Sequence, residues 1–91
     1  MSKVLVRIRV LPVDVSIDLK ELGKRISDSL KGIADVVRTL EEPIAFGLNA
    51  LIVDLVMDER EGGTYDLEQV LSSVDGIGEL DIVRVSLLSG A

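Results

Sequence analysis

The chain has 91 residues, of which 47% are apolar and 29% are charged, and its formal net charge is −6. This length predicts a single domain over residues 1–91, whose core must be aliphatic because the chain has one Phe, one Tyr and no Trp. The absence of cysteine excludes disulfides and thiolate sites, and the absence of histidine removes the commonest general base and metal ligand.

The first two expected elements are a strand over residues 4–11 and a helix over residues 19–31. Apolar residues alternate along the strand, and Pro12 ends it. Asp18 precedes the helix, and Glu21 follows three residues later, which is the pattern of a capping box. The apolar residues of the helix recur at helical spacing, at Leu19, Leu22, Ile26 and Leu30.

Residues 33–41 and 48–57 predict two successive strands, of which the second is the more apolar. Asp54 is an exception within that apolar strand. An acidic, glycine-rich loop follows over residues 58–64. Its acidic groups do not have the spacing of an EF-hand, so we expect a solvated loop and no metal site.

A second helix is expected to begin near Asp66, with Gln69 as its polar partner three residues later. Its apolar stripe consists of Leu67, Val70, Leu71 and Val74. Gly76 and Gly78 are expected to end this helix. A last strand then begins near Glu79, as indicated by the alternation of Val83, Val85 and Leu87.

The order β-α-β-β-α-β predicts a ferredoxin-like α+β sandwich. In this arrangement a four-stranded antiparallel sheet carries both helices on one face. Leu5, Arg7 and Arg9 of the first strand are expected on the face that no helix covers. Many unrelated functions share this fold, so the function has to be inferred from individual motifs.

No segment of the sequence predicts a membrane or nucleic-acid partner. No window reaches the roughly 18 apolar residues that cross a bilayer, and Arg7 and Arg9 interrupt the apolar N-terminal residues. The net negative charge argues against binding to phosphate backbones. Phe46 and Tyr65 lie outside the predicted strands, so the sheet lacks the aromatic platform on which this fold usually stacks RNA bases. We expect a cytoplasmic protein.

The most informative motif joins the two central strands. It reads Glu42-Pro43-Ile44-Ala45-Phe46-Gly47-Leu48. Connections between strands run over the surface, so Phe46 is a candidate contact for another molecule. The alternative is that Ile44 and Phe46 fold back onto the sheet. In either case Gly47 can supply a positive φ, and Pro43 stiffens the loop.

This motif closely resembles the Pro-Ile-(Ala/Gly)-(Phe/Tyr)-Gly loop of the elongation factor 1-beta family. The resemblance covers essentially the whole chain, with less specific similarity at residues 61–64 and 80–83. Members of that family are guanine-nucleotide exchange factors for elongation factor 1-alpha, the GTPase that carries aminoacyl-tRNA to the ribosome. The resemblance therefore implies a ferredoxin-like fold and a protein that promotes GDP release, with no chemical active site, no catalytic residue, no metal and no cofactor.

The resemblance also implies which residues contact the GTPase. In the family the aromatic side chain of the loop packs on the GTPase near its switch region, and Phe46 occupies that position here. Phe46 is thus the expected anchor. The residues that shape the loop around it are Pro43, Ile44, Ala45 and Gly47.

The chain departs from the family pattern at two positions. Asn49 stands where the family commonly has a lysine. Eukaryotic members end in a lysine-leucine pair whose lysine reaches toward the Mg²⁺ site, whereas residues 86–91 contain no basic residue. Arg84 is the nearest cation and is included among the expected GTPase contacts. The alternative is that exchange relies on the loop and on steric change.

Two other classes of function remain open. The first is a small-ligand-binding regulatory module of ferredoxin-like fold, which fold analogy and the glycine-rich loop suggest. A strong homodimer and a saturable small ligand would favour it. The second is a small enzyme that uses carboxylates alone, which the absence of His and Cys makes less favourable. A concave pocket that gathers carboxylates would be needed for it.

Overall fold

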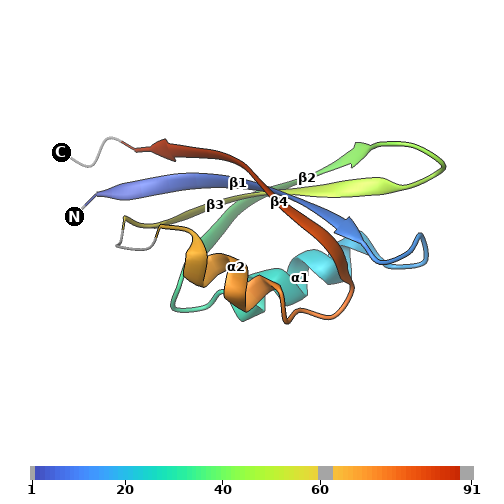
Figure 1. The fold of residues 1–91 in the computed structure, drawn as a ribbon, viewed down its shortest axis with the longest axis horizontal. Coiled ribbons are helices and arrows are strands. Elements are labelled where there is room, and N and C mark those ends of the chain that lie inside the picture. The colour runs from blue at the N-terminus through green and yellow to red at the C-terminus, as the bar shows by residue number, and fades with distance from the viewer. Residues whose placement is uncertain (1, 60–62, 89–91) are drawn as a thin grey trace.

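The structure is a computed structural model that describes residues 2–59 and 63–88. Its elements are β1 (Lys3–Pro12), α1 (Leu19–Ser29), β2 (Asp35–Pro43), β3 (Asn49–Asp58), α2 (Tyr65–Leu71) and β4 (Ile77–Leu87) (Figure 1). Residues 60–62 of the expected acidic loop lie outside the described residues. Residues 89–91, at the end of the segment 86–91 that contains no basic residue, also lie outside them.

The four strands form one antiparallel sheet in the order β2-β3-β1-β4. Both helices lie on the same side of this sheet (Figure 1). This arrangement confirms the predicted ferredoxin-like α+β fold. The two edge strands are each irregular, because register shifts leave Val37 of β2 and Val83 of β4 outside the ladder of paired residues. Such bulges make an edge strand a poor template for pairing with another chain.

The core lies between the sheet and the helices, and it is aliphatic as predicted. The largest fully buried side chains are Ile8, Leu22, Ile26, Leu30, Leu55, Leu67, Leu71, Val6, Val10 and Val53. Asp18 is the N-cap of α1 as predicted, because its carboxylate accepts a hydrogen bond from the backbone N–H of Lys20 at 2.9 Å. This bond satisfies one of the N–H groups that a helix leaves unpaired at its start. The carboxylate of Glu21, the other residue of the predicted capping box, lies 3.7 Å from Nε of Arg25.

The open face of the sheet, the face without helices, presents every second residue of the central strands β1 and β3, whereas the bulges interrupt this alternation in β2 and β4. In β1, Leu5, Arg7 and Arg9 alternate with buried residues that point to the helices, which confirms their predicted orientation. The two edges of the sheet are β2 and β4.

The predicted role of Gly78 as a helix breaker is wrong. The helix α2 already ends at Leu71, and Gly78 lies inside β4, which begins at Ile77 rather than near Glu79. A register shift at this point leaves Gly78 out of the ladder, and a Cβ on Gly78 would lie 3.0 Å from the carbonyl oxygen of Pro12. Glycine in a strand marks such close backbone approaches as readily as it ends a helix.

Gly78→Ala is therefore expected to destabilise the protein by about 1–3 kcal/mol, since backbone atoms of β1 cannot yield to the added methyl group. Urea unfolding would measure this change. The matched control is Gly23→Ala in α1, where the new Cβ would meet only a side-chain atom of Leu51 at an ordinary 3.6 Å. That control should gain up to about 1 kcal/mol from helix propensity. A Gly78→Ala variant as stable as the parent would contradict the close approach.

Candidate functional site

The connection between β2 and β3 is a tight loop over residues 44–48. The backbone N–H of Ile44 donates to the carbonyl of Leu48 at 2.9 Å, and the N–H of Leu48 donates to the carbonyl of Ala45 at 3.0 Å. Two successive residues have a positive φ, 56° at Phe46 and 78° at Gly47. A positive φ is uncommon and costly for a residue with a bulky side chain, and such strain often occurs at functional sites.

The side chain of Phe46 is 99% exposed, so the alternative in which Phe46 folds back onto the sheet is wrong. Ile44, by contrast, is partly buried. The loop thus uses one apolar residue to pack against its own strands and holds the other in water. An aromatic ring that gains nothing from its own fold is available to be buried by a partner.

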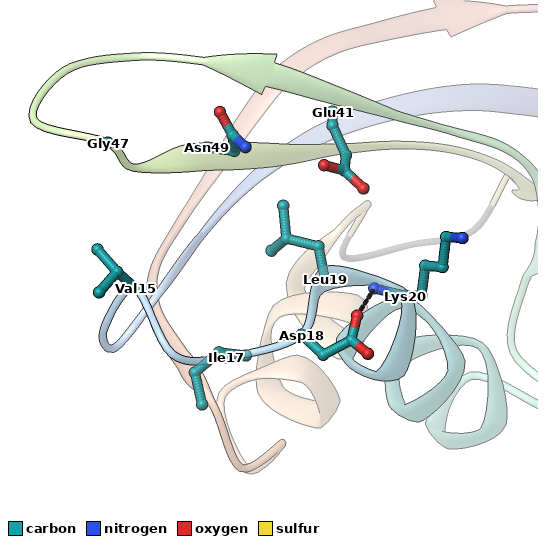
Figure 2. A pocket seen from close by; sticks show the side chains of 8 residues that line it. All are labelled: Val15, Ile17, Asp18, Leu19, Lys20, Glu41, Gly47 and Asn49. Atoms are coloured by element: carbon teal, nitrogen blue, oxygen red, sulfur yellow. Dashed lines mark hydrogen bonds between the residues drawn. The ribbon is translucent and has the colours of Figure 1, made fainter.

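A hollow lies beside this loop, and Figure 2 shows the side chains around it. It has a volume of about 360 Å³. The residues that line it are Val15, Ile17, Asp18, Leu19, Lys20, Glu41, Gly47 and Asn49. The segment before α1 and the β2–β3 hairpin therefore meet at one end of the molecule, which both figures show.

The hollow contains two carboxylates, those of Asp18 and Glu41. The Asp18 carboxylate is already used as the cap of α1, through the bond to Lys20 drawn in Figure 2. Glu41 is exposed to solvent, so the hollow does not gather two free carboxylates in an enclosed space. The hollow is therefore better suited to contact than to chemistry.

Arg84 lies apart from the loop. It belongs to β4 and stands directly opposite Arg7 of β1, which in turn stands opposite Asp54 of β3. Asp54 follows Asn49, the first residue after the loop, by five residues, or about 17 Å of strand at ~3.4 Å per residue. The structure thus brings Pro43, Ile44, Ala45, Phe46 and Gly47 together and places Arg84 elsewhere on the sheet.

Asp54, which the sequence marked only as an exception in an apolar strand, is held by an arginine. Nε of Arg7 lies 2.7 Å from Oδ1 of Asp54, and Nη2 lies 2.9 Å from Oδ2. Asp54 is only 6% exposed, although it lies on the open face of the sheet. The two hydrogen bonds from Arg7 hold the pKa of Asp54 below its ordinary value, and desolvation opposes them.

This lowered pKa predicts how stability depends on pH. In the unfolded chain Asp54 takes its ordinary pKa of about 3.9, so the folded chain binds fewer protons at this site. The pair therefore stabilises the protein fully above about pH 4, and that contribution is lost as the pH falls through the lowered folded pKa.

Urea unfolding at neutral pH and near pH 3 would measure this contribution. Asp14, whose pKa is also lowered, contributes in the same direction. The decrease in the free energy of unfolding between neutral pH and pH 3 should therefore be smaller in Asp54→Asn than in the parent, but it should not vanish. An unchanged pH dependence in this variant would refute the assignment to Asp54.

Within residues 2–59 and 63–88, no helix is long and apolar enough to cross a membrane. In the same described ranges, no group of three or more acidic side chains is placed to hold a metal ion.

Comparison with known proteins finds matches over nearly the full chain. Residues 5–88 match the model of the EF-1 guanine nucleotide exchange domain. Elongation factor 1-beta of Thermofilum pendens is 45% identical over 91 residues, which cover 99% of this chain and 100% of that protein. The proteins of the same name from Aeropyrum pernix and Desulfurococcus amylolyticus are 45% and 46% identical, covering 94% and 98% of this chain and 97% and 100% of their own lengths.

Proposed function

The chain belongs to the elongation factor 1-beta family, and from this premise we propose that it is a guanine-nucleotide exchange factor that promotes GDP release from elongation factor 1-alpha. The observation that carries the proposal is the fully exposed Phe46 on a strained loop. Residues 1–91 would act as one exchange-factor domain in the cytoplasm, with no direct contact to nucleic acid or membrane.

The proposed activity is a binding effect and involves no chemical step. An exchange factor binds the nucleotide-free GTPase more tightly than the GDP-bound form, and by linkage it lowers the affinity for GDP by the same factor. The protein therefore needs an interface but no catalytic residue, cofactor or metal of its own. In a GTPase, the switch segments are held in place by contacts with the nucleotide phosphates and Mg²⁺. A partner that displaces these segments therefore weakens the binding of the nucleotide.

In this proposal the loop docks on the GTPase near its switch region. Phe46 is the anchor, because its ring can be transferred from water to a partner without any change in this protein's core. The backbone hydrogen bonds within residues 44–48 hold the loop in one shape before docking. Such preorganisation reduces the entropy that is lost on binding.

Arg84 is proposed as a contact and not as a substitute for the lysine that reaches the Mg²⁺ site in eukaryotic members. Its position within β4, on the sheet and far from the loop, supports the alternative in which exchange relies on the loop and on steric change.

GDP release tests the proposal. The elongation GTPase is loaded with a fluorescent GDP analogue and chased with excess nucleotide, with and without this protein. We expect substoichiometric protein to accelerate release. If a folded sample leaves an active GTPase unaffected, the proposal fails, and homodimerisation and small-ligand screens would then test the regulatory-module alternative.

A further inference from the structure

One row of charged residues crosses the entire open face of the sheet. The strand pairings place Arg38 of β2 opposite Asp54 of β3, Asp54 opposite Arg7 of β1, and Arg7 opposite Arg84 of β4. Only the central two residues are paired with one another, through the hydrogen bonds described above. Among the residues that the structure describes, Arg38 and Arg84 have no ion pair, and both are exposed.

This row is electrostatically unfavourable for the protein alone. Arg7 and Arg84 stand directly opposite each other, and like charges in that position destabilise a sheet. Asp54 forms its hydrogen bonds and ion pair with Arg7, and Arg38 acts on it only through the Coulomb interaction that helps to lower its pKa. The row by itself therefore carries an excess of two positive charges, although the chain as a whole has a net charge of −6. Because Arg38 and Arg84 have no ion pair within the described part of the chain, their guanidinium groups are available to negative groups of a partner.

The spacing of the row indicates the size of that partner. Arg38 and Arg84 are separated by three strand-to-strand steps, about 14 Å at ~4.8 Å per step. The ion pair of Arg7 with Asp54 lies between them, so a partner would reach Arg38 on one side of this pair and Arg84 on the other. The partner must therefore present separate negative groups over a distance comparable to the width of the sheet.

The neighbouring rows favour discrete carboxylates over a polyphosphate backbone. On the same face, Asp35 and Asp81 stand in the two adjacent rows, and Glu42 and Glu79 stand one row beyond Asp81. Arg9, the one cation that the described pairings place in these rows, lies 3.8 Å from Glu42. A nucleic acid carries negative charge along its whole backbone, so these acidic groups would repel it. A folded protein surface can place a carboxylate against each free arginine and leave the flanking acids in water.

We propose that this arginine row is a second docking surface for the GTPase, which meets Arg38 and Arg84 with carboxylate side chains. The inference rests on the proposed exchange function. Arg7 positions the row through its bidentate bond to Asp54, while Arg38 and Arg84 remain free for the partner. Exposed complementary charges act mainly on the rate of encounter and on its dependence on salt.

The test is the association rate constant with nucleotide-free elongation GTPase, measured at about 50 mM and about 500 mM salt. The variant is Arg38→Glu/Arg84→Glu, and its matched control is Lys24→Glu/Lys31→Glu, which makes the same charge change on exposed positions around the opposite, helical face. Circular dichroism verifies folding. Arg38→Gln/Arg84→Gln replaces the glutamate variant if that variant fails to fold.

At low salt, the arginine variant should associate at least about tenfold more slowly than the parent, and this difference should shrink to about twofold or less at high salt. The lysine control should remain within about twofold of the parent at both salt concentrations.

Three results would overturn the inference or its premise. If the wild-type protein accelerates GDP release but the arginine and lysine variants associate equally well, the second docking surface is wrong and the exchange function stands. If the wild-type protein does not act on the GTPase at all, the proposed function fails and the inference with it. If the row instead retains a single-stranded RNA homopolymer that the arginine variant releases, the surface belongs to nucleic acid and the protein–protein assignment is overturned.

Discussion

Phe46→Ala is expected to reduce stimulated GDP release by at least about 30-fold and to leave the unfolding midpoint unchanged. A central aromatic anchor contributes about 2 kcal/mol or more to binding, which corresponds to that factor at ~1.4 kcal/mol per tenfold. The fold should be unaffected because the ring is 99% exposed and packs on nothing in this protein. The same variant should relieve little strain, since alanine also disfavours the positive φ at this position.

The control for this prediction is Tyr65→Ala. Tyr65 is the only other aromatic residue, it is 60% exposed, and it lies at the start of α2, away from the loop. Its loss should leave GDP release within about twofold of the parent, as expected for residues outside a hot spot. An active Phe46→Ala variant, or an equal loss in both variants, would remove Phe46 as the anchor.

Ile8→Ala is expected to destabilise the protein by about 2–5 kcal/mol, the range for truncating a fully buried branched side chain. Ile8 has no exposed surface and lies in the central strand β1, where it stands opposite Val53 of β3 and Ile82 of β4. The cavity would open where three strands and the helical layer meet. Urea unfolding at neutral pH, with the slope held constant, measures the change.

Val83→Ala provides the contrast. Val83 lies in the adjacent strand, but it is outside the ladder and more than half exposed. Its truncation should change the free energy of unfolding by no more than about 0.5 kcal/mol. Equal effects at the two positions would mean that the core does not centre on β1. The folded fraction of the Ile8→Ala and Val83→Ala variants should still stimulate GDP release, because neither residue belongs to the proposed interface.

The elements that depend on local pattern could be predicted from the sequence. Alternation identified β1 and the direction of Arg7, helical spacing identified α1, and Asp18 marked its start. The exposure of Phe46 was also accessible, because strand connections lie on the surface. What these features share is that each is determined by residues close together in the chain.

The features that depend on pairing between distant strands could not be predicted. From the sequence, Gly78 is predicted to end a helix; only the structure shows that a Cβ at this position would lie 3.0 Å from the carbonyl oxygen of Pro12 in β1. Asp54 reads as an exception in an apolar strand until Arg7 is placed opposite it. The separation of Arg84 from the loop likewise follows from sheet register, which periodicity alone does not determine across strands.

The pairing of β1 with β4 also determines when the sheet can be completed. β1 begins at Lys3 and β4 at Ile77, so β4 is synthesised after every other element. Until then the central strand β1 has one partner and presents a free edge that the finished protein covers. Loop closure over such a sequence separation slows folding. During synthesis, the free edge of β1 is therefore exposed to mispairing until β4 has been made. Chaperones that protect the growing chain would have to act until that point.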